Sequence, residues 1–260
     1  MPSTRFDVLG IGNAIVDVIA RTEEDFLLKQ GMHKGTMALI DEPRAQAIYD
    51  AMGPAIETSG GSAANTIVGL ASLGSRSAFI GKVKDDELGR AFSHDIRAAG
   101  VAYTTPPAAD GPSTARCYVL VTPDGERTMN TYLGAAQDLH PADIDADMVA
   151  ASAVLYLEGY LWDPKNAKDA FLKAAQLAHE AERTVALTLS DAFCVDRWRA
   201  EFLHLMRSRT VDLIFANEAE LQSLYQTSDF DAAMKALRAL FPLERATMTG
   251  SPKASAPHAA

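Results

Sequence analysis

This sequence lacks long apolar runs, closely spaced cysteines and an excess of basic residues. No uncharged apolar stretch reaches the roughly 20 residues that a membrane-spanning helix needs. The first residues, MPSTRFDVLG, lack the basic, apolar and small-residue regions of a signal peptide. The two cysteines, Cys117 and Cys194, lie far apart and have no CxxC partner, which indicates reduced thiols in a cytosolic protein. We therefore expect a cytoplasmic location and no membrane partner.

The charge balance is acidic. The chain has 24 Lys and Arg residues against 34 Asp and Glu residues, so its formal net charge is −10. Because binding along a nucleic-acid backbone needs clustered Lys and Arg, we expect no nucleic-acid partner. One anionic small molecule in a local site remains compatible with this balance. With 48% hydrophobic residues, the 260 residues suffice for one large core.

Short apolar runs alternate with helical patterns along most of the chain. Apolar runs that predict strands lie at 6–11, 77–83, 154–157, 185–189 and 211–215. Patterns that predict helices lie at 62–73, 85–99, 164–182 and 195–206. Such alternation predicts an α/β fold, with a mostly parallel sheet between two layers of helices.

One region interrupts this alternation. Residues 116–122 and 127–133 are strand-like and flank the turn sequence P-D-G-E at 123–126, which predicts a β-hairpin. A hairpin inserted into an α/β chain often projects from the main sheet as a cover. Residues 17–41 contain strand-like pieces that could pair with it. We therefore expect a single α/β domain with a small β lid, formed by segments of about 17–41 and 103–133.

Two segments place polar groups beside predicted strand ends. Asn13 and Asp17 follow the first strand, where open α/β sheets bind ligands, and a carboxylate there can accept hydrogen bonds from the vicinal hydroxyls of a sugar. Gly60 and Gly61 let the backbone approach a ligand, and the following helix places Asn65 one turn further on. A loop or capping role for Asp17 and close helix packing for the glycines are the alternatives.

Four motifs occur in order along the chain. They are G-N-A-I-V-D-V (12–18), G-G-S-A-A-N-T-I-V-G-L-A-S-L-G (60–74), G-K-V-K-D-D-E-L-G (81–89) and N-E-A-E (217–220). Together they resemble the PfkB (ribokinase-like) family of sugar and nucleoside kinases, and they span most of the chain. The first motif and L-S-D-A-F-C-V-D-R (189–197) are most similar to the adenosine-kinase branch.

The resemblance implies a ribokinase-like three-layer α/β/α sandwich and an activity. Members of this family use ATP and Mg²⁺ to phosphorylate a primary hydroxyl of a sugar or nucleoside. Asp17 would hold the ribose hydroxyls, Gly61 and Asn65 would bind the substrate, and Asn13 would lie nearby. The predicted hairpin would be part of a lid whose closure excludes water from the reaction.

The resemblance also assigns a role near the end of the chain. Asn217 and Glu220 would help to place Mg²⁺ and the phosphates, through water molecules, because Mg²⁺ keeps much of its hydration shell. From the residues alone, a helix N-cap followed by an acidic residue in the first turn is the better interpretation of this pair. Lys82, Lys84, Asp85 and Asp86 are interpreted as a solvated helix entry, although the resemblance places them near the hinge of the lid.

One family motif has no counterpart in these 260 residues. Nothing matches D-T-x-G-A-G-D, whose glycine-rich turn holds the developing charge and whose last Asp takes the proton of the attacking hydroxyl. We therefore expect a C-terminally truncated chain with absent or very weak activity, with residues 250–260 as a loose tail. Loss of the covering elements predicts an open strand edge and self-association, beside the possibilities of a monomer or a lid-mediated homodimer.

Two other functions remain as alternatives. The chain could be a noncatalytic remnant that binds a sugar or nucleoside. It could also be a Rossmann-type dehydrogenase, since Gly10 and Gly12 begin a glycine-rich turn, but Ile15 stands where the third glycine of that fingerprint belongs.

Overall fold

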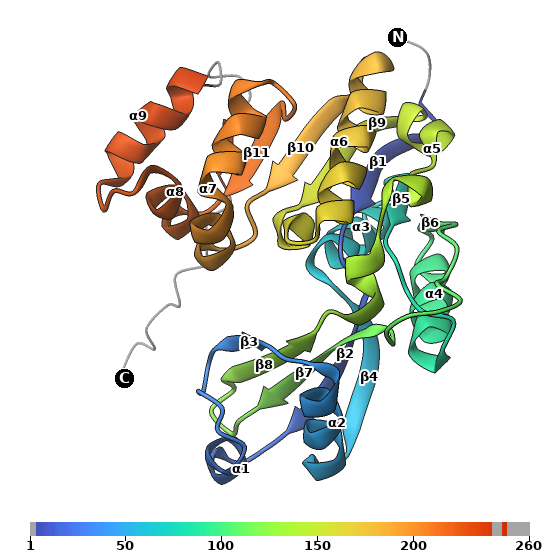
Figure 1. Cartoon of the computed structure of the whole chain (residues 1–260), viewed down its shortest axis with the longest axis vertical. Helices are drawn as coiled ribbons and strands as arrows, with labels where there is room; N and C mark the ends of the chain where they lie inside the picture. The colour runs from blue at the N-terminus through green and yellow to red at the C-terminus, as the bar shows by residue number, and fades with distance from the viewer. Residues whose placement is uncertain (1–3, 241–245, 249–260) are drawn as a thin grey trace.

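Two β-sheets organise the chain, and the computed structural model describes residues 4–240 and 246–248. In Figure 1 the larger sheet and its helices fill the upper part of the molecule, and the smaller sheet lies below. The chain passes between them four times, beginning where β1 in the larger sheet is followed by β2 in the smaller one. The predicted loose tail, residues 250–260, lies outside the described residues.

The larger sheet consists of seven strands that pair in parallel. In spatial order they are β12 (Ala246–Met248), β11 (Leu213–Ala216), β10 (Thr184–Thr188), β9 (Ser152–Glu158), β1 (Phe6–Ile11), β5 (Ser77–Ile80) and β6 (Ala102–Tyr103). The chain first builds outward from β1 through β5 to β6, then returns to β9 on the other side of β1. The strand order therefore reverses beside β1, which is where open α/β sheets form ligand crevices.

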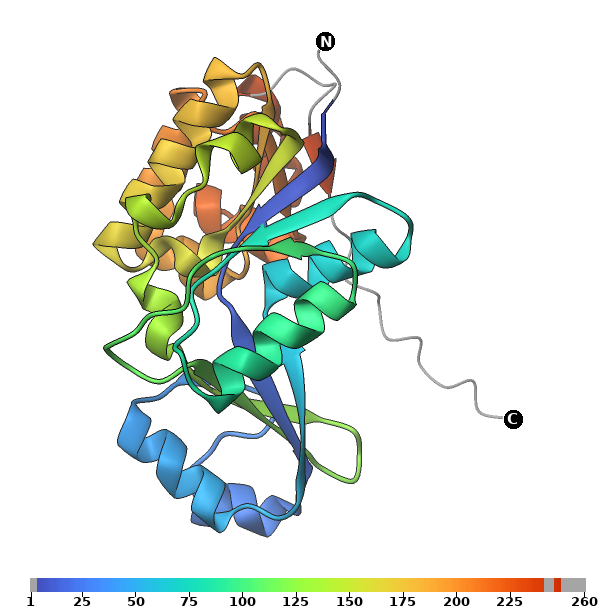
Figure 2. The same cartoon turned by 90° about the vertical axis from the view of Figure 1, so that its right-hand side faces the viewer.

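Helices cover both faces of this sheet and complete the predicted three layers (Figure 2). Leu9 and Ile11 of β1 pack in one apolar core, whereas Val8 packs in another on the opposite face. Helices α3 (Ser62–Ser72) and α4 (Glu87–Ala98) cover the Val8 side. The other side is covered by α5 (Ala146–Ala150), α6 (Lys165–Glu180), α7 (Ala192–Arg207), α8 (Glu218–Tyr225) and α9 (Phe230–Leu240). The predicted ribokinase-like α/β sandwich is confirmed.

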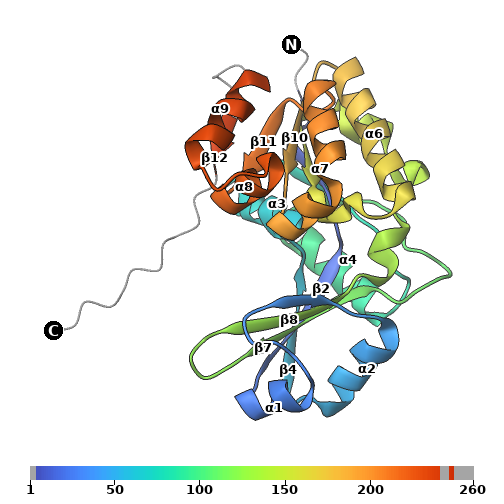
Figure 3. The ribbon, with the colours of Figure 1, turned by 60° about the vertical axis from the view of Figure 1, so that its left-hand side comes forward.

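The smaller sheet, which we call the lid sheet, has five strands. In spatial order they are β3 (Met37–Leu39), β8 (Arg127–Tyr132), β7 (Ala115–Val121), β2 (Ile15–Arg21) and β4 (Ala55–Gly60). The predicted hairpin is confirmed, because β7 and β8 pair antiparallel around the turn and project away from the larger sheet (Figure 3). Strands β2 and β3 of the 17–41 segment pair with this hairpin. Strand β4, which the sequence did not assign to the lid, forms one edge.

The two faces of the lid sheet differ in what covers them. Helices α1 (Glu24–Lys29) and α2 (Glu42–Ala51) cover one face and pack on Tyr118 and Leu120. Cys117 and Val119, which alternate with these residues along β7, belong to a separate cluster on the opposite face. That second face turns toward the larger sheet and forms the roof of the cavity described below.

Short 3₁₀ segments complete the described chain. They are η1 (Gly134–Asp138) and η2 (Pro141–Asp143), between β8 and α5, and η3 (Gly159–Trp162), which follows β9. Within the described ranges, no helix combines the length and the apolar character needed to cross a membrane.

Candidate functional site

A cavity of about 320 Å³ lies between the lid sheet and the carboxyl ends of β1 and β9. Its floor includes the segments that follow these two strands, so it occupies the crevice where the strand order reverses. The lid sheet forms its roof, which is mostly apolar: Met37, Leu39, Cys117, Val119, Met129 and Leu133. The same sheet also contributes Asp17, Arg127 and Thr131, so the cavity combines a broad apolar surface with a few polar groups, as small-molecule sites commonly do.

The predicted substrate residues converge here. Asn13, Asp17, Gly61 and Asn65 all line the cavity. Gly60 lies directly behind the Asp17 carboxylate, and a Cβ at this position would overlap the carboxylate oxygens. These five residues therefore lie together in the structure, although they come from the loop after β1, from β2, from the end of β4 and from the start of α3.

Asp17 is half-buried and has an unusual environment for a carboxylate. It lies on β2, opposite Cys117 of β7 and Thr58 of β4. Within the described residues nothing donates a hydrogen bond to it, and burial raises the pKa of Asp17 to about 6. A carboxylate that is desolvated without a partner is ready to accept hydrogen bonds from hydroxyl groups of a ligand.

Behind the cavity floor, Glu158 joins the loop after β1 to the start of α3. Its side chain is 1% exposed and accepts hydrogen bonds from the backbone N–H of Asn13 (2.6 Å), the Asn13 amide Nδ2 (3.1 Å) and the backbone N–H of Ala63 (3.0 Å). Burial raises the pKa of Glu158, and these donors oppose that shift. The carboxylate also lies at the N-terminus of α3, where the helix dipole favours negative charge.

This arrangement orients the Asn13 side chain. Because Nδ2 donates to Glu158, the amide oxygen Oδ1 is left as an acceptor, and it is buried with no hydrogen-bond partner in the described part of the chain. Buried polar atoms are rarely left unpaired. A hydroxyl of a ligand in the cavity would supply the missing donor.

The turn from β4 into α3 depends on Gly61. This residue caps α3 with φ at +99°, in the region that favours glycine, and a Cβ on it would overlap the carbonyl oxygen of Asn13. The close approach brings the first turn of α3 to the cavity wall. Asn65, one turn along the helix, is exposed toward the same space.

An aromatic side chain lies on the cavity wall formed by α7. Phe193 is 60% exposed, and the guanidinium of Arg197 lies 4.4 Å from its ring centroid. Asp163 holds this guanidinium with two hydrogen bonds, from Nε (3.2 Å) and Nη2 (2.8 Å). Because Asp163 holds Arg197 against the ring, Phe193 presents a fixed aromatic surface to the cavity, on which a flat apolar group could stack.

Asn217 and Glu220 do not line the cavity and bond mainly to each other. Asn217 Oδ1 accepts from the Glu220 N–H (2.9 Å), and the Glu220 carboxylate accepts from the Asn217 N–H (3.1 Å) and Nδ2 (2.7 Å). This capping box starts α8. Burial raises the pKa of Glu220, which is 4% exposed. Since each carboxylate oxygen already accepts a bond, contact with a metal ion through water fits this pair better than direct coordination.

The sequence did not identify every residue of this site. Glu158 and the Asp163–Arg197 pair were missed, although 189–197 was noted as a motif. The available signal for Glu158 was a lone acidic residue that ends the apolar run 154–157. In residues 4–240 and 246–248, no group of three or more His, Cys, Asp or Glu side chains is placed to hold a metal ion.

Comparison with known proteins places this chain in a family. The pfkB family of carbohydrate kinases matches residues 55–247, so the chain belongs to this family. Its architecture is that of the ribokinase-like enzymes, as the similar structures show.

Two solved structures are similar over most of the chain. A probable sugar kinase from Rhizobium etli CFN 42 is 53% identical, with a TM-score of 0.89 over 95% of this chain and 74% of that one. An adenosine kinase from Sinorhizobium meliloti is 56% identical, with a TM-score of 0.88 over 95% of this chain and 75% of that one. Among curated proteins, guanosine-inosine kinase of Escherichia coli K12 is 27% identical over 85% of this chain. The chain spans about half of that relative's length, 53%.

Proposed function

We propose that this chain forms the acceptor-binding part of an ATP-dependent kinase that phosphorylates the primary hydroxyl of a nucleoside. The observation that carries the proposal is the pairing of unsatisfied acceptors in one cavity. The Asp17 carboxylate and the Asn13 amide oxygen both lack hydrogen-bond donors within residues 4–240, and both residues line the cavity. The vicinal hydroxyls of a ribose ring would donate to these two groups.

The apolar side of the cavity favours a nucleoside over a free sugar. A free sugar would place hydroxyl groups against the apolar roof, where they would lose hydrogen bonds to water. A nucleobase attached to the ribose would instead bury flat apolar surface under Met129 and Leu133 and beside Phe193. The 56% identity to a protein named adenosine kinase supports adenosine as the first nucleoside to test.

The donor we propose is ATP with Mg²⁺, on the basis of family membership. Asn217 and Glu220 would contribute indirectly, through water that contacts the metal ion and phosphates. Asp191 lies between the two regions, since it lines the cavity and its charge also acts on Glu220. This position supports a donor site beside the acceptor cavity.

Binding and transfer are separable for this chain. The 260 residues contain no D-T-x-G-A-G-D segment, so we propose that these residues on their own bind the acceptor and transfer phosphate very weakly or not at all. A noncatalytic nucleoside-binding protein is therefore the second candidate function. A transfer assay with radiolabelled ATP and adenosine, ribose or fructose distinguishes the two. Clear phosphate transfer to adenosine, ribose or fructose would establish that the chain itself is a kinase.

We further propose a cytoplasmic protein that does not bind nucleic acid and is a monomer or a homodimer through the lid sheet. The acidic net charge of −10 supports the absence of nucleic-acid binding. The open outer edge of β4 and the 71% exposed Ile56 support contact between copies. Sedimentation of the chain and of Ile56→Lys would test this, since a lid-mediated dimer should weaken in the variant.

A further inference from the structure

The G-K-V-K-D-D-E-L-G motif, residues 81–89, lies at the joint between the two sheets. The interpretation of its charged residues as a solvated helix entry is wrong for Lys82, which is 8% exposed and bonds to Asp143 of η2 (Nζ to Oδ1, 2.6 Å). A buried ion pair of this kind constrains the segment that follows the lid hairpin. Lys84, Asp85 and Asp86 contact the segment that precedes the hairpin.

Lys84 and its neighbours hold the connection from β6 to β7, residues 104–114. The backbone of Lys84 forms an isolated parallel β-bridge with Ala108, and its Nζ donates to the carbonyl of Ala109 (2.6 Å). The Lys84 N–H donates to the hydroxyl of Thr114 (3.0 Å). The connection is therefore fixed to the motif at several points before the chain enters the lid sheet.

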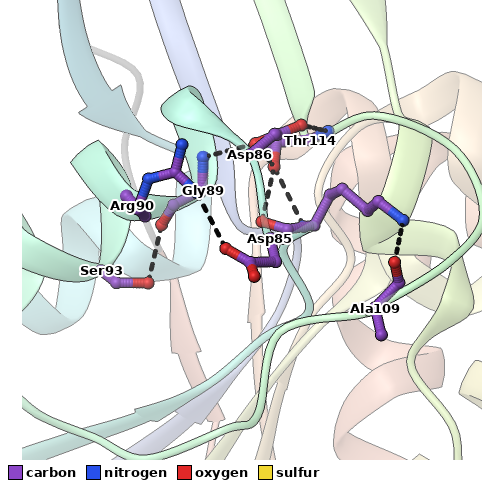
Figure 4. Close-up of polar contacts among 8 residues, drawn as sticks. Asp85, Asp86, Gly89, Arg90, Ser93, Ala109 and Thr114 are labelled. Carbon is purple, nitrogen blue, oxygen red and sulfur yellow. Dashed lines mark hydrogen bonds and ion pairs between the residues drawn. The ribbon is translucent and has the colours of Figure 1, made fainter.

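Asp86 also contacts this connection, through Thr114 (Figure 4). Its carboxylate accepts from the N–H of Thr114 (2.8 Å) and the Thr114 hydroxyl (2.6 Å), and also caps α4 by accepting from the N–H of Gly89 (2.8 Å). Thr114 is fully buried and directly precedes β7. One side chain thus ties the start of a lid strand to the start of a helix in the other layer.

The glycine of the motif makes this contact possible. A Cβ at Gly89 would overlap the carbonyl oxygen of Lys84 and lie 2.9 Å from the Thr114 hydroxyl. Any larger residue would push α4 away from the connection. The D-x-x-G spacing from Asp86 to Gly89 therefore serves the joint as well as the helix cap.

The end of the hairpin is joined to the same point. The N–H of Ala135, just after β8, donates to the carbonyl of Ser113 (2.9 Å). Gly134 lies against that carbonyl, with φ at +40° and no room for a Cβ. Strand β7 enters the lid sheet and strand β8 leaves it beside Thr114, so this residue is the common base of the hairpin.

We propose that Asp86 is a positioning residue that fixes the pivot of the lid hairpin, and so sets how the apolar roof meets a ligand on the cavity floor. The inference rests on the proposed function for its consequence, because the roof matters only if a ligand binds beneath it. The claim that Asp86 fixes the base of the hairpin concerns the chain without a ligand. With Thr114 held, the start of β7 cannot slide along α4.

Hydrogen exchange measured by mass spectrometry on the ligand-free chain tests this directly. Asp86→Ser keeps an oxygen that can cap α4 but cannot also hold Thr114. Loss of the two bonds to Thr114 should speed amide exchange in peptides covering 113–118 and 130–136 by roughly tenfold. Thr114→Val, which keeps only the backbone bond, should speed the same peptides by less.

Asp145→Ser is the matched control, because Asp145 caps α5 through the N–H of Met148 and, within residues 4–240, forms no hydrogen bond with the lid sheet. It should leave exchange at the hairpin base unchanged. If Asp86→Ser alters only the first turn of α4, or if Asp145→Ser loosens the hairpin equally, the proposal is wrong. Since no ligand is present, this result is independent of whether the chain binds a nucleoside. Asp86→Ser changes none of the residues that line the cavity. If this variant binds adenosine more weakly than the parent chain, the contact at Asp86 also affects how the roof meets a ligand.

Discussion

At the scale of single residues, Asp17 has the environment that a binding carboxylate needs. Half-buried and without a partner in the described chain, it has a pKa raised to about 6. The adjacent Gly60 leaves room for its oxygens. Burial of this kind destabilises the ionised form in the free protein, so hydroxyl groups that donate to it recover lost interactions.

The first prediction concerns pH. Because the folded-state pKa of Asp17 is raised above its usual 3.8, the side chain is neutral below about pH 6 and ionised above it. An ionised carboxylate accepts two hydroxyl donors, so adenosine affinity should increase as the pH rises from 5 to 7 and then level off. Titration calorimetry across this range measures it. Asp17→Asn should bind weakly with a flat profile, and an unchanged pH dependence in this variant would assign the effect to another group.

The raised pKa of Asp17 also makes the stability of the folded chain depend on pH. Between pH 3.8 and about 6 the folded chain holds a proton on Asp17 that the unfolded chain has released, so this residue favours folding less as the pH rises through that window. Asp17→Asn removes the ionisable group. Its gain in melting temperature over the parent chain should therefore be larger at pH 7.5 than at pH 4.5, as thermal melts at the two pH values would show.

The third residue-scale prediction concerns Glu158. Glu158→Gln replaces one acceptor oxygen by an NH₂ group, which would face the N–H groups of Asn13 or Ala63. We expect a loss of about 1–3 kcal/mol in the free energy of unfolding and weaker adenosine binding, because Asn13 loses its fixed orientation. Denaturant unfolding and calorimetry measure the two effects. Glu180→Gln, at an exposed carboxylate of α6, should change neither.

At the scale of elements, α8 begins with a complete capping box, and this bears on the role of Asn217. Asn217→Ala should lower the free energy of unfolding by about 1 kcal/mol through loss of the cap. Asn217→Ser should restore most of it, because a hydroxyl can accept from the Glu220 N–H. Neither change should alter adenosine affinity, since the pair lies outside the cavity. A large loss of adenosine binding in Asn217→Ser with normal stability would contradict this separation.

The sequence predicted some elements well and others not at all. Apolar runs located the central strands closely, because a strand buried on both faces must be apolar along its length, as β1 and β9 are. Strand β4 was not predicted as part of the lid, because its residues A-I-E-T-S-G are mostly exposed and carry no periodic signal. Strand β3 has three residues and is defined by its pairing with β8, about 90 positions later. Such pairing leaves no local trace.

The same distinction holds for the site. Asn13, Asp17, Gly61 and Asn65 could be found because motifs with fixed spacing contain them. Glu158 lies 145 residues from Asn13, and only the three-dimensional arrangement reveals that it orients the amide. The mistaken view of Lys82 has a similar cause, since its partner Asp143 is 61 residues away. Local charge patterns predict exposure, and they fail where a distant opposite charge is available.

At the scale of the whole molecule, the lid sheet and the larger sheet form the two walls of one cavity. The floor comes from segments after β1 and β9, and the lid sheet contributes the apolar residues of β7 and its neighbours together with Asp17 on β2. Four chain crossings connect the walls, and the 81–89 motif holds the crossings before β7 and after β8. The family match over residues 55–247 includes both walls in part.

Calorimetric titration of adenosine into the 260-residue chain and into Asp17→Ala tests the central claim most directly. The account predicts one site per chain that Asp17→Ala abolishes and that Asp50→Asn, at an exposed carboxylate of α2 outside the cavity, leaves intact. Ribose should bind more weakly than adenosine, because it does not reach the apolar roof. Absence of adenosine binding by the folded parent chain, or equal binding by Asp17→Ala, would contradict the account.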